Sequence, residues 1–419
     1  MRVPDAVLDR GYAKLAPGVR RAYRFLGSLP GTVVIDADLI GALVTVDWDT
    51  ADSVLRTLAD HDLAEPCAPG ARRERRYRLT APAHARRLTT AHDTSEEQRA
   101  AVRRMCEWIT TCALIARQQL LPRNPSLASP DTDRYPVPFA DDGAMTWLNG
   151  HRPTLRTALW ATTTHGWDTL GWQLVHGMWP LLTDKRPVSL WAEAAHLGLA
   201  AARRTGHGWA EREMLFCGAT GLLTFGATAD ALGWFTELKQ SARTARDDHD
   251  EGRGAFGQAL CHHQDARADT ALFCLDQAIT LWDACGNHDG TALASLTAGE
   301  ITLEGDDLPR ATALLTRAYD LLPPPDTSFE ATCALALLGQ AHLQAGHHEQ
   351  GIAELHEALK VFEHDAEIRW QVRVLGYLAR EATVHEDEGL AQHLLQQAAA
   401  LDEPPRPGEK TARLLARLP

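Results

Sequence analysis

The chain has 419 residues, of which 45% are apolar and 23% are charged. This is the composition of an ordinary globular protein, and the length suits two or three domains or one elongated array. The formal net charge of −13 argues against a general binder of nucleic acid or of anionic membranes, and leaves room only for a local basic patch.

Cysteine spacing and the first residues bear on the cellular compartment. The eight cysteines include no CxxC pair, which favours buried, reduced thiols. The opening segment, MRVPDAVLDRGYAKLAPG, carries charges where a signal peptide needs an apolar core. No apolar run reaches the roughly 18 residues of a membrane helix. We therefore expect a cytoplasmic protein.

Helical spacing of apolar residues predicts three short helices near the N-terminus. The first contains VRRAYRFLGSL and ends at Pro30-Gly31, and the second covers Asp38 to Val44. The third begins after Thr50, which we take as its N-cap, and buries a valine and two leucines.

A β-hairpin is predicted after these helices. Pro69-Gly70 marks a turn, and the alternation in Arg76-Tyr77-Arg78-Leu79 is typical of a strand with Tyr77 and Leu79 facing inward. Three helices followed by a hairpin is the order of a winged helix-turn-helix. We assign residues 1–92 to a small winged-helix-like domain.

A longer helix and a proline-rich connection follow. Ser95 and Gln98 have the spacing of a capping box, which predicts a helix that runs to about Leu121. Five prolines between residues 122 and 142 then exclude a long helix. We assign residues 93–143 to a helical linker and Pro-rich connection.

The second half of the chain repeats every 40 residues. Small residues recur at a fixed spacing where one helix backbone must lie close to the next, which predicts stacked helix pairs. The three series are Ala278, Ala318, Ala358 and Ala398; Ala271, Ala311, Gly351 and Ala391; and Ala259, Gly299 and Gly339, with Gly376 slightly early.

We therefore expect a mainly α protein whose residues 144–403 form a tetratricopeptide-like α-solenoid, with a tail at 404–419 that holds one short basic helix. The expected helix pairs are 167–182 with 187–204, 208–225 with 229–246, 252–265 with 268–285, 289–304 with 308–322, 328–345 with 348–363, and 367–384 with 387–401.

The order of these parts resembles a known family. The run LAPGVRRAYRFLGSLPG, the winged domain, the run MTWLNGHRPTLRTAL and the repeats are similar to the C-terminal half of actinobacterial regulators. These are the NB-ARC–tetratricopeptide proteins related to antibiotic regulatory proteins. The most specific parts are Leu29-Pro30-Gly31 and Trp147-Leu148 with Arg152-Pro153. The resemblance implies a winged helix, tetratricopeptide repeats and a regulatory role, including in secondary metabolism.

Two departures from that family limit what the resemblance implies. No GxxxxGK[ST] sequence occurs, so the phosphate-binding loop is absent from this chain, and the resemblance places its start after the NTPase module. Where the family has a His-Asp-Leu motif that senses the nucleotide, this chain has Thr80-Ala81-Pro82. We expect the fold without ATP-dependent switching, and no cofactor.

DNA binding is the first function that a winged helix suggests. The third helix carries four aspartates around a lone Arg56, and such a helix should repel the duplex. The wing is basic, and a wing can hold the DNA backbone with little sequence readout. Its arginines are Arg72, Arg73, Arg75, Arg76 and Arg78. We expect weak DNA contact through them, or, as the alternative, a solvated or protein-binding edge.

Tryptophans are concentrated between Trp147 and Trp234. Trp172, His176 and Trp179 share one face of the predicted helix 167–182. Arg212 and Phe216 share one face of the predicted helix 208–225, the first helix of the next pair. If these faces line the groove of the repeats, they suit a ligand with one apolar plane and one anionic or polar end. The alternative is that the aromatic residues fill the core between repeats.

Patterns for metals and nucleophiles are weak. The adjacent residues in Cys261-His262-His263 and His347-His348 point to different sides of a helix and cannot chelate together. HExxH and GxSxG are absent as well. We predict no metal and identify no catalytic residues.

These observations favour a non-enzymatic regulatory or scaffold protein. Its groove would bind a peptide, a protein or a small apolar ligand, and a homodimer is compatible with this. The alternative is an enzyme of secondary metabolism with a Trp-lined pocket. A closed cavity with a desolvated acid or histidine favours the enzyme, and an open polar groove favours peptide recognition.

Without a phosphate-binding loop, the chain should not bind nucleotides. We expect titration with ATP or ADP to give no heat in a calorimeter, because no backbone cradle or lysine is present for the phosphates. A dissociation constant in the micromolar range would contradict this expectation.

Overall fold

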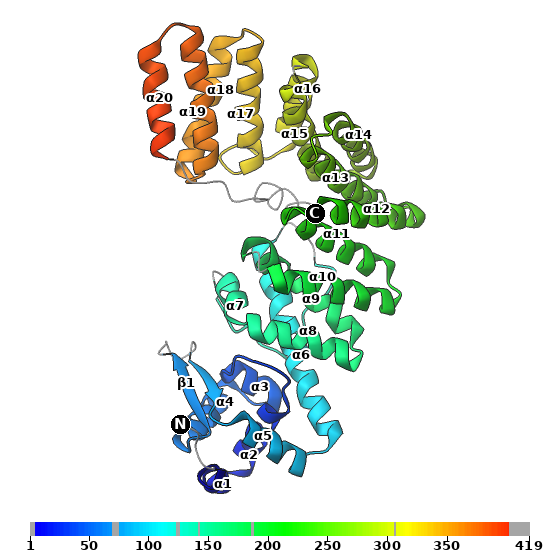
Figure 1. The fold of residues 1–419 in the computed structure, drawn as a ribbon, viewed down its shortest axis with the longest axis vertical. Helices are drawn as coiled ribbons and strands as arrows, with labels where there is room; N and C mark the ends of the chain where they lie inside the picture. The colour runs from blue at the N-terminus through cyan, green and yellow to red at the C-terminus, as the bar shows by residue number, and fades with distance from the viewer. Residues whose placement is uncertain are drawn as a thin grey trace. The chain divides into compact units, whose positions relative to one another are not determined.

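The computed structural model describes residues 5–68, 75–122, 126–140, 143–185, 188–305 and 307–401. Within these ranges the chain forms twenty helices and one two-stranded sheet (Figure 1). Contacts divide the chain into two compact units, Met1–Met214 and Leu215–Pro419. In the described ranges, no helix combines the length and the apolar character needed to cross a membrane.

The first unit begins with the predicted order of three helices and a hairpin. An additional helix precedes them and another follows. Ala64 pairs with Leu79 in the antiparallel hairpin, and Tyr77 is buried as predicted. The elements are α1 (Asp5–Lys14), α2 (Pro17–Ser28), α3 (Ala37–Val44), α4 (Trp48–Asp60), β1 (Ala64–Ala68), β2 (Arg76–Leu79) and α5 (Pro82–His92).

Two predicted helix starts are wrong by a few residues. Helix α4 is capped by Asp47, whose carboxylate accepts from the backbone N–H of Thr50 at 2.8 Å, so Thr50 lies inside the helix. Helix α6 (Ser95–Leu120) is capped by Thr94 with Glu97, one residue before the predicted box. In both cases the residue that caps is the one whose side chain reaches the third backbone N–H of the helix.

From Ala144 onward the described chain is helical. The rest of the first unit contains α7 (Ala144–Gly150), α8 (Arg152–His165), α9 (Asp168–Lys185) and α10 (Val188–Thr205), and α11 (Gly208–Thr224) crosses the boundary. The second unit contains α12 (Thr228–Ala245), α13 (Asp248–Gln264), α14 (Ala268–Cys285), α15 (His288–Glu304), α16 (Leu308–Leu321), α17 (Phe329–Gln344), α18 (His348–His364), α19 (Ile368–Val384) and α20 (Glu388–Ala400).

The observed bounds lie within four residues of the predicted ones, so the predicted helices are confirmed. Contacts also confirm the pairing of α9 with α10, α13 with α14, α15 with α16, α17 with α18 and α19 with α20. No helix occurs between Leu120 and Ala144 in the described part of that connection. The predicted basic helix at 404–419 lies outside the described residues.

Small residues lie at close contacts between helices, as the 40-residue period predicts. Ala278, Ala318 and Ala358 are completely buried. A Cβ atom on Gly299 would lie 2.7 Å from the side chain of Leu315. The close approach predicted at Gly376 is wrong, because a Cβ there would meet nothing within 4 Å.

First and second helices of the pairs differ in how they are covered. In α15 every residue from Gly290 to Leu303 is buried, so this first helix is enclosed on all sides. In the second helix α16, only Ala311, Leu315 and Ala318 are buried, which gives it one apolar stripe. The other faces of the second helices are open to solvent. Exposed ion pairs connect neighbouring second helices, such as Arg310 of α16 with Asp276 of α14, where Nη2 and Oδ2 lie 2.9 Å apart.

Two alanine substitutions test the close approach with the same chemical change. Gly339→Ala places a methyl group 2.8 Å from Leu355 Cγ and 3.0 Å from the carbonyl oxygen of Gly351. We expect the free energy of unfolding to fall by about 1–3 kcal/mol through overpacking. Gly376→Ala puts the methyl group in open space beside α19. Because alanine has the better helix propensity, we expect this substitution to raise the free energy of unfolding by roughly 0.5–1 kcal/mol.

Urea unfolding followed by circular dichroism measures both variants against the unchanged protein. If Gly339→Ala is as stable as Gly376→Ala, the backbones of α17 and α18 do not lie as close as described.

Candidate functional site

A buried ion pair joins α3 to the start of α8. The Nε2 atom of His151 lies 2.9 Å from Asp36 Oδ2, and Nδ1 lies 2.9 Å from the carbonyl oxygen of Trp147. Both ring nitrogens of His151 therefore lie within hydrogen-bond distance of an oxygen atom. Asp36 also caps α3 by accepting from the backbone N–H of Leu39 at 2.9 Å. One carboxylate therefore caps a helix and contacts a histidine from another element.

Aromatic rings enclose this ion pair. Trp147 stacks on His151 with ring centroids 4.3 Å apart, and Trp108 of α6 meets both rings edge-on at 6.0 and 5.9 Å. Stacked and edge-on contacts between aromatic rings are favourable arrangements. Trp147, one of the residues that carry the family resemblance, thus helps to hold α3, α6 and α8 together.

The segment after Pro30-Gly31 is hydrogen-bonded to α8. Val34 donates its backbone N–H to Thr154 Oγ1 at 2.8 Å, and Thr157 Oγ1 donates to the carbonyl oxygen of Thr32 at 2.7 Å. Gly31 has φ +68°, and a Cβ there would approach Thr157 Oγ1 to 3.0 Å. Two sequence motifs more than 100 residues apart, Leu29-Pro30-Gly31 and Arg152-Pro153, therefore lie side by side.

A pocket of about 770 Å³ lies at this junction and is called the Trp160 pocket below. Trp160 retains 49% of its surface exposed, which is unusual for so large an apolar side chain. The volume is in the range of small-molecule and peptide side-chain pockets. Its lining is Pro30, Gly31 and Thr32 after α2; Arg152, Pro153, Arg156, Thr157 and Trp160 on α8; and Ser189 and Leu190 on α10.

The polar groups that line the Trp160 pocket are held by hydrogen bonds to neighbouring side chains. Arg156 donates Nε–H to Glu193 Oε2 at 2.8 Å, and this hydrogen bond raises the pKa of the Arg156 guanidinium. Trp160 Nε1 donates to the same carboxylate oxygen at 3.4 Å. Arg152 Nε is buried without a hydrogen-bond partner, although its NH2 group donates to Asn149 at 2.5 Å. The arrangement suits an apolar group with an oxygen acceptor beside it.

The predicted tryptophan strip is buried. Trp172, His176 and Trp179 are 1%, 0% and 2% exposed. His176 Nε2 accepts from the backbone N–H of Leu127 at 3.2 Å, so Nδ1 carries the proton and donates to Glu213 Oε1 at 3.0 Å. This neutral ring ties the Pro-rich connection to α9 and α11. The burial fits the alternative interpretation, core packing, and ligand binding at this strip stays a prediction.

The other two predicted ligand residues are also buried. Arg212 is 7% exposed and belongs to the first unit, whereas Phe216 is 1% exposed and belongs to the second. The guanidinium carbon of Arg253 lies 3.8 Å from the centre of the Phe216 ring, which is a close cation–π contact within the second unit.

The wing arginines have protein contacts where they are described. Arg72 and Arg73 lie outside the described residues. Arg78 donates Nε–H to Glu65 Oε1 at 2.7 Å, and this hydrogen bond raises the pKa of the Arg78 guanidinium. The guanidinium of Arg76 lies against Gly150 of α7. Arg75 is exposed. Two of the three described arginines thus have contacts within this chain, and both DNA contact and the alternative of a solvated or protein-binding edge stay predictions.

Substitution of two tryptophans separates core from surface. Trp179→Ala should lower the free energy of unfolding by about 3–5 kcal/mol, because it leaves a large cavity. Trp160→Ala should change it by less than about 1 kcal/mol, because half of that side chain already meets solvent. Thermal unfolding of both variants measures the difference, and equal losses would contradict the assignment of Trp160 to the surface.

Comparison with known proteins was made over the whole chain. No family model matches it. It is similar to the Regulatory protein AfsR of Streptomyces griseus, with 24% identity over 390 residues that cover 92% of this chain and 38% of that protein. The chain therefore spans well under half the length of this relative.

Solved structures with a similar arrangement include two proteins. One is a signal transduction ATPase with numerous domains and a tetratricopeptide repeat sensor from Pyrococcus horikoshii, at 12% identity and a TM-score of 0.47, covering 99% of this chain and 61% of that one. The other is the apo form of RapI, at 10% identity and a TM-score of 0.45, covering 61% of this chain and 94% of that one.

Proposed function

We propose that this chain is a non-catalytic regulatory protein that binds a partner on its helical repeats. The observation that carries the proposal is the similarity to a regulatory protein over 92% of the chain, which includes most of the N-terminal helices and hairpin as well as the repeats. Stacked helix pairs support it, since such arrays act chiefly as binding surfaces.

The Trp160 pocket is the proposed contact point in the first unit. A partner segment with an apolar side chain would cover Trp160, and a carbonyl or carboxylate oxygen beside that side chain would accept from the guanidinium of Arg152 or Arg156, which line the pocket.

The location of the Trp160 pocket supports a regulatory role for it. Thr32 and Thr157 line it and are also hydrogen-bonded to each other across the junction of α2 and α8. A partner in the pocket would therefore touch both sides of the junction and favour the arrangement in which they meet. A ligand shifts an equilibrium in this way only by its different affinity for the two arrangements.

Within this proposal residues 1–92 form a winged helix-turn-helix that transmits the bound state. Arg75 and the neighbouring wing arginines would give weak, salt-dependent contact with DNA or with another protein. The buried cluster of Trp172, His176 and Trp179, together with Arg212, would stiffen the helices behind the pocket. Such a cluster shapes the repeats without touching the partner.

Complementation of a deletion strain tests the proposal. Deleting the gene should change the transcript levels of a defined set of other genes. The Trp160→Ala variant, produced at the normal level, should fail to restore them, because the partner loses its apolar contact. Phe273→Ala, which removes a 62% exposed aromatic ring from the second unit, should restore them and serves as the matched control.

Two outcomes would overturn parts of this proposal. If deletion changes a metabolite but no transcript, the regulatory function is wrong. If Trp160→Ala restores transcript levels as well as Phe273→Ala does, the Trp160 pocket is not the contact point.

A further inference from the structure

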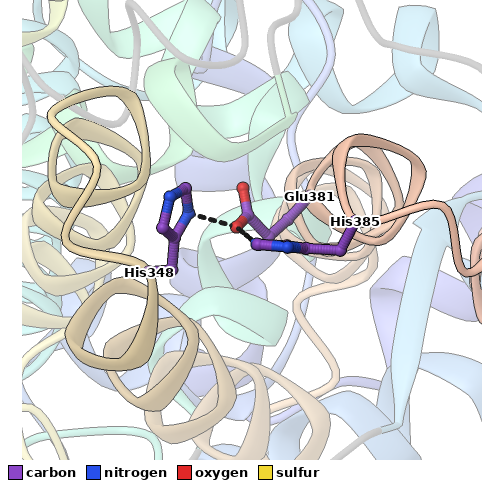
Figure 2. Close-up of side chains that lie close together, drawn as sticks. All are labelled: His348, Glu381 and His385. Atoms are coloured by element: carbon purple, nitrogen blue, oxygen red, sulfur yellow. Dashed lines mark hydrogen bonds and ion pairs between the residues drawn. The ribbon is translucent and has the colours of Figure 1, made fainter.

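Two histidines and a glutamate meet where the start of α18 lies beside the end of α19. His348 is the first residue of α18, Glu381 lies in the last turn of α19, and His385 is the C-cap of α19. Figure 2 shows both imidazole rings directed at the same carboxylate. The helices are antiparallel neighbours, so the start of one and the end of the other lie together.

The three ligand atoms are close and partly open to solvent. His348 Nδ1 lies 2.5 Å from Glu381 Oε1, and His385 Nε2 lies 2.9 Å from the same oxygen. All three atoms lie within 4.8 Å of one another. The Glu381 side chain is only 8% exposed, whereas the two rings are 39% and 52% exposed. The carboxylate is thus fixed, and the rings can be reached from solution.

We propose that His348, Glu381 and His385 form a binding site for zinc. Two imidazole nitrogens and one carboxylate oxygen are a known ligand set for Zn²⁺, with a fourth position left for water or another ligand. Imidazole nitrogen also discriminates against Mg²⁺ and Ca²⁺, which prefer oxygen ligands. The exposure of both rings leaves room for the fourth ligand.

The geometry needs only a small adjustment to hold the ion. Tetrahedral ligands at Zn–N and Zn–O distances near 2.0–2.1 Å lie about 3.3 Å apart. The two nitrogen–oxygen distances of 2.5 and 2.9 Å would therefore open by less than about 1 Å. The two nitrogens lie within 4.8 Å of each other, and because the rings are 39% and 52% exposed we expect ring rotation to bring them to the tetrahedral spacing.

Zinc and protons compete for the same nitrogens. In the hydrogen-bonded arrangement each ring donates an N–H to Glu381 Oε1, whereas a zinc ligand must offer a lone pair at that atom. Each neutral ring therefore moves its proton to its other nitrogen when zinc binds, and a charged ring loses a proton. Zinc affinity should accordingly fall as the pH is lowered.

A bound ion would join α18 to α19 more firmly than the hydrogen bonds do. The ligands come from two helices and are 33 residues apart in sequence, so binding occurs only in the folded pair. A ligand that binds only the folded state stabilises it. The site would thus make the stability of this part of the repeat array depend on zinc.

The second cluster with suitable atoms is less open to a metal. Asp247, His249 and Asp250 also lie close together. However, Asp247 caps α13 by accepting from the backbone N–H of Asp250, and Asp250 accepts from the guanidinium of Arg253 at 3.0 Å. These carboxylates already have strong partners, and the cluster offers a single imidazole.

Calorimetry with the whole chain tests the site. ZnCl₂ is titrated into tag-free protein that has been treated with a chelator, and the melting temperature is measured with and without zinc. The variants are His348→Ala and His385→Ala, whose side chains are 39% and 52% exposed, so their removal should leave the fold intact. The control is His356→Ala, which removes another exposed histidine of α18.

We expect one zinc ion per chain, a melting temperature that rises with zinc, and no comparable heat from MgCl₂. His348→Ala and His385→Ala should each weaken zinc binding at least about tenfold and remove the rise in melting temperature, while His356→Ala keeps both. If the two variants bind zinc as well as His356→Ala does, the ion sits on other histidines and the proposal is overturned. Failure of wild-type protein to bind zinc overturns it too.

Discussion

The repeat array depends on the contact of one helix backbone with the next. At the pair of α17 and α18 the contact is reciprocal, because a Cβ on Gly339 would lie 3.0 Å from the carbonyl oxygen of Gly351, and a Cβ on Gly351 would lie 2.7 Å from that of Gly339. Neither position has room for a side chain. Leu355 fills the space beside Gly339 and Leu343 the space beside Gly351, and this close contact fixes how far apart the two helices of the pair stand.

That constraint explains why so much of the repeat fold could be predicted from sequence. Each repeat has a small residue at the same position, where two helix backbones come close. The spacing of these residues therefore gives the register of the helix pairs directly. Prediction failed at Gly376, where the spacing is 37 rather than 40 and the glycine faces open space. Helix starts were also displaced, because several polar residues near Asp47 and Thr94 have the right chemistry and only the geometry of the turn selects one.

The candidate sites were harder to predict because their residues meet only in three dimensions. Asp36 and His151 are separated by 115 residues, and neither has a local signal that names the other. His348 was considered as a ligand only together with its neighbour His347, which points to another side of the helix. Its partners Glu381 and His385 come from the next helix. Clusters of tryptophan, in contrast, mark both cores and pockets, so sequence could not assign Trp160 and Trp179 to different roles.

The enclosure of α15 has a consequence for how such an array changes length in evolution. A helix buried on every side has no face suited to water, so it cannot stand at an end of the array or be left behind when its neighbour is lost. Duplications and deletions that keep a folded protein must therefore add or remove an enclosed helix together with the striped helix that shields it. The 40-residue unit visible in the sequence is the smallest step by which this surface can be extended.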